Sequence, residues 1–402
     1  MTVAAFMELA LYDPELGYYA RTAQRSGRAG DFFTSVDVGP LFGALLEAQL
    51  AEMAALLSDQ SPIPHPQSHF DLVEAGAGNA RLSADILRAA RARHPALYDS
   101  LRLHLVEASA VARAAQRATL GDAADRLVYS GGAMPASFDG VLIANELLDA
   151  MPMHQVVMRE DGLREIYVSS KSQVPSSKSQ VPSSKSQVPS SKSVASLETR
   201  DSRLETRDLE LGTVEGSPST PALQAYLDRA GVTLEPGWRA EINLRAVDWV
   251  REATRRLGRG FMILVDYGHE ARELYSATHS AGTLTSFSGH RSAGPESSAH
   301  APAWLQQPGE RDITAHVDFS SVRAAAEAEG MKTIAFLDQT YFLLGLLPAL
   351  NQQSSQQPTL NTQQLKTLIM PGGLGSTHKV LLLGKGVGTP ALKGTSFTVR
   401  VT

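Results

Sequence analysis

Short apolar runs alternate with amphipathic segments along most of this 402-residue chain. The runs have the length of buried strands, and apolar residues in the segments between them recur every three or four positions, as on one face of a helix. This alternation favours an α/β fold with a parallel sheet and crossover helices. Strands are predicted at 70–75, 101–107, 126–129, 139–144, 260–266, 331–337 and 378–384, and a hairpin at 153–158 and 164–168. Helices are predicted at 3–11, 39–57, 81–92, 221–230, 241–257 and 319–330, and a polar loop at about 268–312.

A different pattern interrupts this alternation in the middle of the chain. The segment Ser169-Ser-Lys-Ser-Gln-Val-Pro175 recurs at 176–182 and at 183–189. Each copy carries one valine beside a proline, so the repeat has neither the apolar seam of a coiled coil nor a core of its own. We therefore expect residues 169–215 to form a disordered, low-complexity insert that leaves and rejoins the fold at neighbouring points.

Composition is that of an ordinary globular protein and excludes several classes. Apolar residues make up 43% of the chain and charged residues 20%. The net charge of −5 argues against nucleic-acid binding, which normally requires a basic face. The chain contains no cysteine, so disulfides, thiolate metal sites and cysteine nucleophiles are excluded. No secretory leader and no run of eighteen apolar residues is recognisable, so we expect a cytoplasmic protein without membrane insertion.

The first predicted strand and the one after it both end in a glutamate. Glu74 is followed by Gly76-Ala-Gly78 and then by a helix, a strand–turn–helix arrangement that brings backbone N–H groups close to a ligand. Glu107 ends the next strand, where its carboxylate is suited to accept both hydroxyls of a ribose. A dinucleotide fold requires a third glycine where this chain has Arg81. The pattern therefore favours S-adenosylmethionine, whose cationic amino group suits Glu74; a tight turn in another α/β protein is the alternative.

Acidic side chains also follow the fourth predicted strand. Asn145 and Glu146 end it, and Asp149 lies three residues beyond Glu146, on the same face if a helix begins there. A guanidinium group offers only N–H donors, so carboxylates are needed to hold it and to accept its proton. Glu146 and Asp149 are therefore candidate catalytic residues for methyl transfer to a guanidinium. Alternatively, both acids cap the following helix.

Three further segments are candidates for the same site. The segment Gly30–Ser35 is too rich in glycine and hydroxyl groups for a helix, and Thr34 within it either lies over the cofactor or belongs to a surface turn. Asp266-Tyr-Gly268 is either a wall of the substrate site or a simple turn. His316, in a loop expected to cover the site, is either catalytic or structural. Short metal-ligand spacings such as H-E-x-x-H do not occur, so we expect no metal.

Several of these motifs, taken in order, resemble the MidA-like methyltransferases, a family that includes a mitochondrial complex I assembly factor that methylates arginine. The resemblance spans essentially the whole chain apart from the insert. The matching segments are Leu11–Tyr19, Gly30–Ser35, Glu74–Gly78, Ala144–Pro152, Val265–Gly268 and Pro308–Phe319. The family usually shows Gly-Pro-Gly-Arg-Gly where this chain has Gly76-Ala-Gly-Asn-Ala80.

The resemblance implies a class I methyltransferase fold, a Rossmann-like sheet of seven strands with helical additions. It assigns Glu74, Gly76, Gly78 and Glu107 to S-adenosylmethionine and places Thr34, Asn145 and Glu146 close to it. Residues 1–68 are expected to form a helical region covering the cofactor site, and 69–168 with 216–402 the methyltransferase domain. The expected partner is a protein substrate, a respiratory-complex or other assembly subunit, with a homodimer left open. A non-catalytic assembly factor or chaperone on the same fold is the alternative function.

Overall fold

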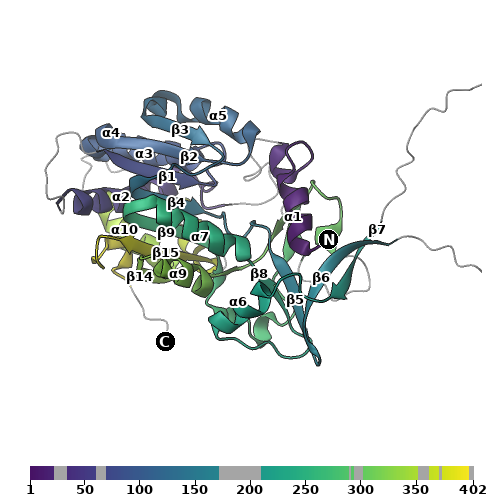
Figure 1. The fold of residues 1–402 in the computed structure, drawn as a ribbon. Helices are drawn as coiled ribbons and strands as arrows, with labels where there is room; N and C mark the ends of the chain where they lie inside the picture. Colours follow the sequence, from purple (N-terminus) through teal and green to yellow (C-terminus); the bar gives the residue numbers. More distant parts are fainter. Residues whose placement is uncertain are drawn as a thin grey trace, which may run out of the picture.

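The computed structural model describes residues 1–21, 34–59, 69–171, 210–288, 291–293, 302–351, 362–370 and 374–397. A large twisted sheet covered by helices on both faces forms most of the molecule, and a smaller sheet lies to one side of it beneath helix α1 (Figure 1).

The large sheet has the strand order β14-β15-β9-β4-β1-β2-β3, with the two-residue strand β13 added at the end of β9. Its bounds are β1 Phe70–Ala75, β2 Leu101–Val106, β3 Leu127–Gly131, β4 Phe138–Asn145, β9 Leu257–His269, β13 Val317–Asp318, β14 Lys332–Asp338 and β15 His378–Lys385. Strands β1, β2, β3, β4 and β9 run parallel to one another, whereas β15 is antiparallel to both β9 and β14. The seven predicted strands and the parallel sheet are confirmed.

The strand order reverses at β1, which has β2 on one side and β4 on the other. Ligands of open α/β sheets bind beyond the carboxyl ends of the strands at such a switch point. The fold therefore brings together the turns after β1, β2 and β4, in which the sequence carries its glycines and glutamates.

Helices bury an apolar core on each face of the sheet. Strand residues alternate between the two cores: Leu72 and Val141 pack on one side, Val73 and Leu142 on the other. The helices on the first side are α2 Pro40–Asp59, α3 Arg81–Arg93, α4 Pro95–Ser100 and α10 Gln339–Asn351, together with α11 Thr362–Ile369. Those on the second side are α6 Ala222–Ala230, α7 Leu244–Arg256 and α9 Phe319–Ala328.

Within the described residues, only α2 is long and apolar enough to cross a bilayer by length and composition. Its residues Phe42, Leu45 and Leu50 are completely buried in the first core. This packing accounts for the apolar composition of the helix.

The smaller sheet has the order β7-β6-β5-β8, with bounds β5 His154–Arg159, β6 Gly162–Lys171, β7 Glu210–Gly216 and β8 Arg239–Ile242. Helix α1, Val3–Tyr12, packs on it through Val3 and Met7, which share a third core with Val157 and Ile166. The N-terminal region is thus divided, because α1 lies on the small sheet and α2 on the large one (Figure 1).

The predicted hairpin is confirmed as β5 and β6, but the boundaries expected for the insert are wrong. Ser169 pairs with Gly212, Ser170 with Leu211 and Lys171 with Glu210 in an antiparallel ladder. The first three residues of the expected insert and its last six therefore belong to strands β6 and β7, because pairing between the two arms continues into the repeat. The rest of the predicted disorder, at 172–209, lies outside the described residues.

Two further predictions need correction. The helix expected from Glu241 begins at Leu244, because the Asn243 side chain accepts the Ala246 N–H at 2.8 Å and caps it; Arg239–Ile242 pairs as β8 instead. In the segment expected to be a polar loop, short polar strands form a three-stranded sheet whose bounds are β10 Thr285–Ser288, β11 Arg291–Ala293 and β12 Asp312–Thr314.

Candidate functional site

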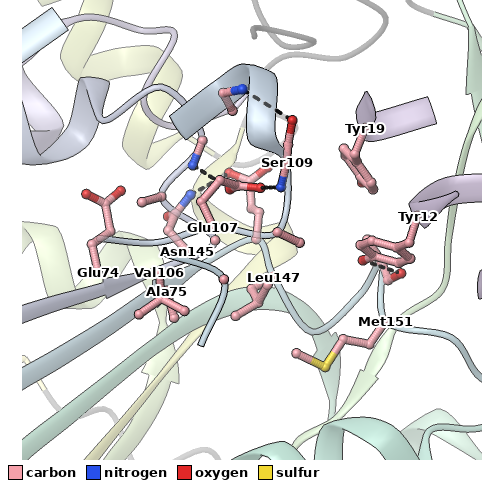
Figure 2. A pocket seen from close by; sticks show the side chains of 18 of the residues that line it. Tyr12, Tyr19, Glu74, Ala75, Val106, Glu107, Ser109, Asn145, Leu147 and Met151 are labelled. Atoms are coloured by element: carbon pink, nitrogen blue, oxygen red, sulfur yellow. Dashed lines mark hydrogen bonds between the residues drawn. The ribbon is translucent and has the colours of Figure 1, made fainter. Parts of the chain in front are cut away.

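A cavity of about 540 Å³ opens beyond the carboxyl ends of β1, β2 and β4. It is lined by seven residues that the sequence singled out: Thr34, Glu74, Gly76, Gly78, Glu107, Asn145 and Glu146. Helix α1, the short helix η1 (Tyr18–Ala20) and α7 supply Glu8, Tyr12, Tyr19, Arg245 and Trp249. Figure 2 shows Tyr12 and Tyr19 across the cavity from Glu74 and Ala75.

The turn after β1 has a backbone that favours glycine. Gly76 has φ +70°, and a Cβ atom there would lie 3.0 Å from Leu147 Cδ1. Its N–H donates to Val106 O at 2.9 Å, which ties the turn to β2. Gly78 has φ +50°, and nothing lies within 4 Å of where its Cβ would be. The turn is therefore open toward the cavity, so a ligand can approach the backbone closely.

Ala80 stands where the family pattern has its third glycine, and its backbone shows what this replacement costs in conformational energy. It has φ +71°, the left-handed conformation, immediately before α3. An L-residue with a Cβ pays about 1–2 kcal/mol for this conformation, which is why glycine is favoured there. The Ala80 side chain is completely buried in the first core and does not line the cavity. The missing glycine therefore adds backbone strain without narrowing the cavity.

Glu107 joins the turns after β1 and β2. Its Oε2 accepts the Gly78 N–H at 2.8 Å, and its Oε1 accepts the Ser109 N–H at 2.7 Å (Figure 2). Ser109 in turn caps helix α5, Ala110–Leu120. Each carboxylate oxygen has a second lone pair, so both remain able to accept a hydroxyl donor from a ligand. Glu107 is thus held by its backbone bonds in the place expected for a ribose-binding acid.

Glu74 lies at the buried end of the cavity. Its carboxylate accepts a hydrogen bond from the Ser83 hydroxyl on α3. Burial raises the pKa of Glu74 from 4.5 to about 7, and the negative charge of Glu107 adds to the rise. A cationic group placed beside Glu74 would offset this cost, which fits the amino group of an amino-acid ligand.

Asn145 and Glu146 form the wall at the end of β4. The Asn145 Nδ2 donates to Glu146 Oε1 at 3.2 Å. Among the described residues, the buried Oδ1 of Asn145 has no hydrogen-bond partner. A buried acceptor without a donor is costly, so this oxygen is suited to receive an N–H group of a ligand.

Several donors surround the Glu146 carboxylate. Tyr267 OH donates to Oε2 at 3.4 Å, and the Ser35 N–H donates to Oε1 at 3.4 Å. The His378 ring lies beside that of Tyr267, with Nε2 3.4 Å from Oε1, but its Nδ1 donates to Leu374 O at 2.9 Å and Nε2 has no hydrogen-bond partner among the described residues. The two rings pack against each other with centroids 4.0 Å apart. Burial, together with the nearby acids, raises the pKa of Tyr267 far above its usual value, so its hydroxyl keeps its proton and can donate. Tyr267, from the Asp266–Gly268 motif, therefore contacts Glu146 without lining the cavity itself.

The expectation that Asp149 shares a helical face with Glu146 is wrong. Glu146 has φ +50°, which no α-helix contains, and Asp266 Oδ2 accepts the N–H groups of Leu147 and Leu148 at 3.1 and 2.8 Å. The chain turns sharply, and Asp149 points away from the cavity, where its Oδ2 accepts the Thr314 hydroxyl at 2.6 Å. Burial raises the pKa of Asp149 to about 6.

His316 does not line the cavity either. Its backbone N–H donates to the Thr283 hydroxyl at 3.1 Å, and its ring lies beside those of His269 and His279. The geometry gives it no contact with the wall formed by Asn145 and Glu146.

The sequence did not indicate how the segment containing Thr34 is held. Thr34 Oγ1 and its N–H both donate to Asp37 Oδ2, at 2.9 and 3.0 Å. Asp37 Oδ1 in turn accepts from Arg81 Nη1 at 2.5 Å. The arginine that replaces the dinucleotide glycine thus fixes the turn that carries Thr34. A salt bridge between residues 44 positions apart leaves no local sequence signal.

Comparison with known proteins agrees with this geometry. Residues 45–337 match a family model described as "Putative S-adenosyl-L-methionine-dependent methyltransferase". The chain belongs to this family of methyltransferases. The resemblance to MidA-like enzymes is confirmed, and so is S-adenosylmethionine as the cofactor.

Curated relatives include a mitochondrial protein named protein arginine methyltransferase NDUFAF7 in Mus musculus, 28% identical over 85% of this chain and 70% of that protein. The Drosophila melanogaster homologue is 26% identical over 82% of this chain and 67% of its own length. A solved structure from Burkholderia thailandensis, bound to S-adenosyl-homocysteine, is 26% identical with a TM-score of 0.77, over 99% of this chain and 90% of that one.

These relatives also overturn one expectation. The mouse and fly relatives are mitochondrial proteins, which contradicts the cytoplasmic location predicted for this methyltransferase. That prediction depended on composition and on the first residues of the sequence, and neither records the compartment in which a folded domain works.

Proposed function

We propose that this methyltransferase transfers a methyl group to an arginine guanidinium of a protein substrate. The observation that carries the proposal is the position of Glu146, whose carboxylate lines the cavity and accepts from three donors, the side chains of Asn145 and Tyr267 and the Ser35 N–H. A carboxylate fixed in this way can hold a planar guanidinium and orient one of its nitrogens. S-adenosylmethionine supplies the electrophilic methyl group when it is bound.

Glu74, Gly78, Glu107 and Asn145 are the residues that we propose for the cofactor, together with Gly76 and Thr34. Glu107 would accept the ribose hydroxyls, and the free acceptor Asn145 Oδ1 would receive the cationic amino group together with Glu74. These contacts leave the Glu146 carboxylate on the wall beyond the cofactor, where the substrate must arrive.

The work of the protein in the reaction is positioning and proton removal. Glu146 would accept a hydrogen bond from a guanidinium N–H and align that nitrogen for in-line attack on the methyl carbon. As the new carbon–nitrogen bond forms and the carbon–sulfur bond breaks, the nitrogen loses a proton, and the Glu146 carboxylate would accept it. The products are a methylated guanidinium and S-adenosyl-homocysteine.

The outer part of the cavity suits a cationic side chain. The centroids of the Tyr12 and Tyr19 rings lie 5.4 Å apart, and both rings line the cavity across from Glu74 (Figure 2). Their hydroxyls are fixed, since Tyr12 donates to Ala150 O at 3.1 Å and Tyr19 to Asp312 Oδ1 at 2.8 Å. Aromatic faces attract a guanidinium. Glu8 lines the same side of the cavity and is paired there with Arg245, whose Nη1 lies 3.4 Å from its Oε2.

We propose a division of labour between the parts of the chain. Residues 69–168 and 216–402 form the methyltransferase domain, whereas the segments of 1–68 that line the cavity cover the cofactor and select the substrate. The names of the mouse and fly relatives favour a protein substrate, and a subunit of a respiratory or other assembly is the candidate.

Isotope transfer tests this proposal. The purified full-length chain, with S-adenosylmethionine carrying a deuterated methyl group, is incubated with a lysate of cells that lack it, and peptides are analysed by mass spectrometry. We expect the label on arginine, and no label with Glu146→Gln although that variant still binds S-adenosyl-homocysteine. Label on another residue type would refute arginine. No label from a wild-type protein that binds the cofactor would favour a non-catalytic assembly factor.

A further inference from the structure

Three histidine rings meet at the carboxyl end of β9, and none of them lines the cavity. His269 ends β9, His279 ends the short helix η3 (Ala277–His279), and His316 precedes β13. Their ring centroids are separated by 4.9, 5.2 and 5.9 Å. One nitrogen from each ring lies within 4.8 Å of the others, and all three residues are half-buried.

A hydrogen bond orients one of these rings, and a carboxylate lies beside a second. His279 Nδ1 lies 3.1 Å from Glu273 O and donates to it, so its Nε2 carries the free lone pair. His269 Nδ1 lies 3.0 Å from the Glu273 carboxylate. Glu273 belongs to helix α8, Ala271–Leu274, which follows β9 directly. Carboxylate and backbone acceptors on the second nitrogen are the usual outer partners of metal-bound imidazoles.

We propose that His269, His279 and His316 bind one divalent transition-metal ion of the Zn²⁺ type, with Glu273 as outer partner. Tetrahedral zinc with bond lengths of about 2.0–2.1 Å places its nitrogens roughly 3.4 Å apart, so small side-chain rotations suffice to close the site. Burial lowers the pKa of His269 and lowers that of His316 to about 4, and neutral rings keep the lone pairs that a metal requires.

The position of the cluster indicates a structural role. Strand β13, which follows His316, pairs with Gly268 and His269. Two residues before His316, Thr314 donates to Asp149, and Asp266 on the same strand as His269 holds the turn after Glu146. A metal here would therefore fix the two segments that support the catalytic wall without touching the cavity. Because the ligands are 10 and 37 residues apart, no short spacing in the sequence reveals them, which is why no metal was expected.

Metal titration of the untagged, full-length protein tests the proposal. After chelator treatment, Co²⁺ is added as a spectroscopic probe and then displaced by Zn²⁺ in competition with a chromogenic chelator. We expect one ion per chain, with the intense visible bands of tetrahedral Co²⁺. Saturating, weak bands typical of octahedral Co²⁺, or no stoichiometric binding, would overturn the proposal without any variant.

Variants then assign the ligands. His279→Ala and His316→Ala should abolish stoichiometric binding, and Glu273→Gln should weaken it by about 10–100-fold. His69→Ala, at an exposed histidine outside the cluster, is the matched control and should bind like wild type. Circular dichroism and S-adenosyl-homocysteine binding confirm that each variant is folded. Unchanged metal affinity in folded His279→Ala and His316→Ala would show that the rings merely pack together.

Discussion

The carboxylate of Glu107 accepts the backbone N–H of Gly78 at 2.8 Å, so the end of β2 holds the glycine turn that follows β1. The same carboxylate accepts the Ser109 N–H, which belongs to the cap of α5. One side chain therefore fixes both backbone segments that flank the ribose position. Its loss would affect the ligand directly and also loosen the walls around it.

Replacing Glu107 with alanine should weaken S-adenosyl-homocysteine binding by about one to two orders of magnitude, because two charge-assisted hydrogen bonds to the ligand are lost. Isothermal titration calorimetry measures the change. The exposed Glu235 provides the control, and Glu235→Ala should leave the affinity unaltered. An unchanged dissociation constant for Glu107→Ala would remove this residue from the cofactor site.

Glu74 should make the stability of the fold pH-dependent. Its pKa is raised from 4.5 in the unfolded chain to about 7 in the fold, so the folded state retains a proton that the unfolded state has lost. Glu74 therefore does not lower the free energy of unfolding below pH 4.5. As the pH rises from 4.5 to about 7, the free energy of unfolding falls by about 3 kcal/mol in total because of this group.

Glu74→Gln removes this titration while preserving an acceptor for the Ser83 hydroxyl. We expect the difference in unfolding free energy between variant and wild type to grow in favour of the variant from pH 4.5 to 7. Urea denaturation at several pH values measures it. A difference that stays constant across this range would mean that Glu74 titrates normally in the fold.

The sequence was sufficient to predict the large sheet because its strands are apolar runs buried on both faces. It was sufficient for the cavity wall as well, since glycine and glutamate at the ends of neighbouring parallel strands necessarily come together. The sequence was not sufficient where a distant residue decides the local conformation. Asp149 was assigned to the site on the assumption of a helix. The positive φ of Glu146 and the N–H groups that Asp266 accepts create a turn instead. Strand β12 is too short and polar for its pattern to be recognised.

Glu146 and Asp149 should therefore respond differently to neutralisation. Glu146 lines the cavity, so Glu146→Gln should lower kcat by about 100-fold or more, with little effect on S-adenosyl-homocysteine binding. Asp149 is buried behind it and has its pKa raised to about 6, so Asp149→Asn should lower kcat less than tenfold. Steady-state kinetics of both variants, with the protein that receives the deuterated methyl group as substrate, measures the two losses of kcat. Equal losses of kcat would show that the two acids act as a unit.

The pairing of Lys171 with Glu210 predicts that the repeat segment can be removed without harm to the fold. These two residues stand opposite each other at the ends of β6 and β7, which is the register that a two-residue turn closes. Replacing residues 172–209 with Asn-Gly should therefore complete a tight hairpin and leave the melting temperature within a few degrees of wild type. Differential scanning calorimetry and S-adenosyl-homocysteine titration check both properties.

A longer deletion, which also removes paired residues of β6, provides the control. Removing 169–209 instead eliminates three residues of β6 that pair with β7, so it should lower the melting temperature more than the shorter deletion does. The small sheet packs against α1, which carries Tyr12 into the cavity, so the longer deletion should also weaken the binding of substrate. If the shorter deletion were the more damaging of the two, the repeat itself would have to contribute contacts to the folded protein.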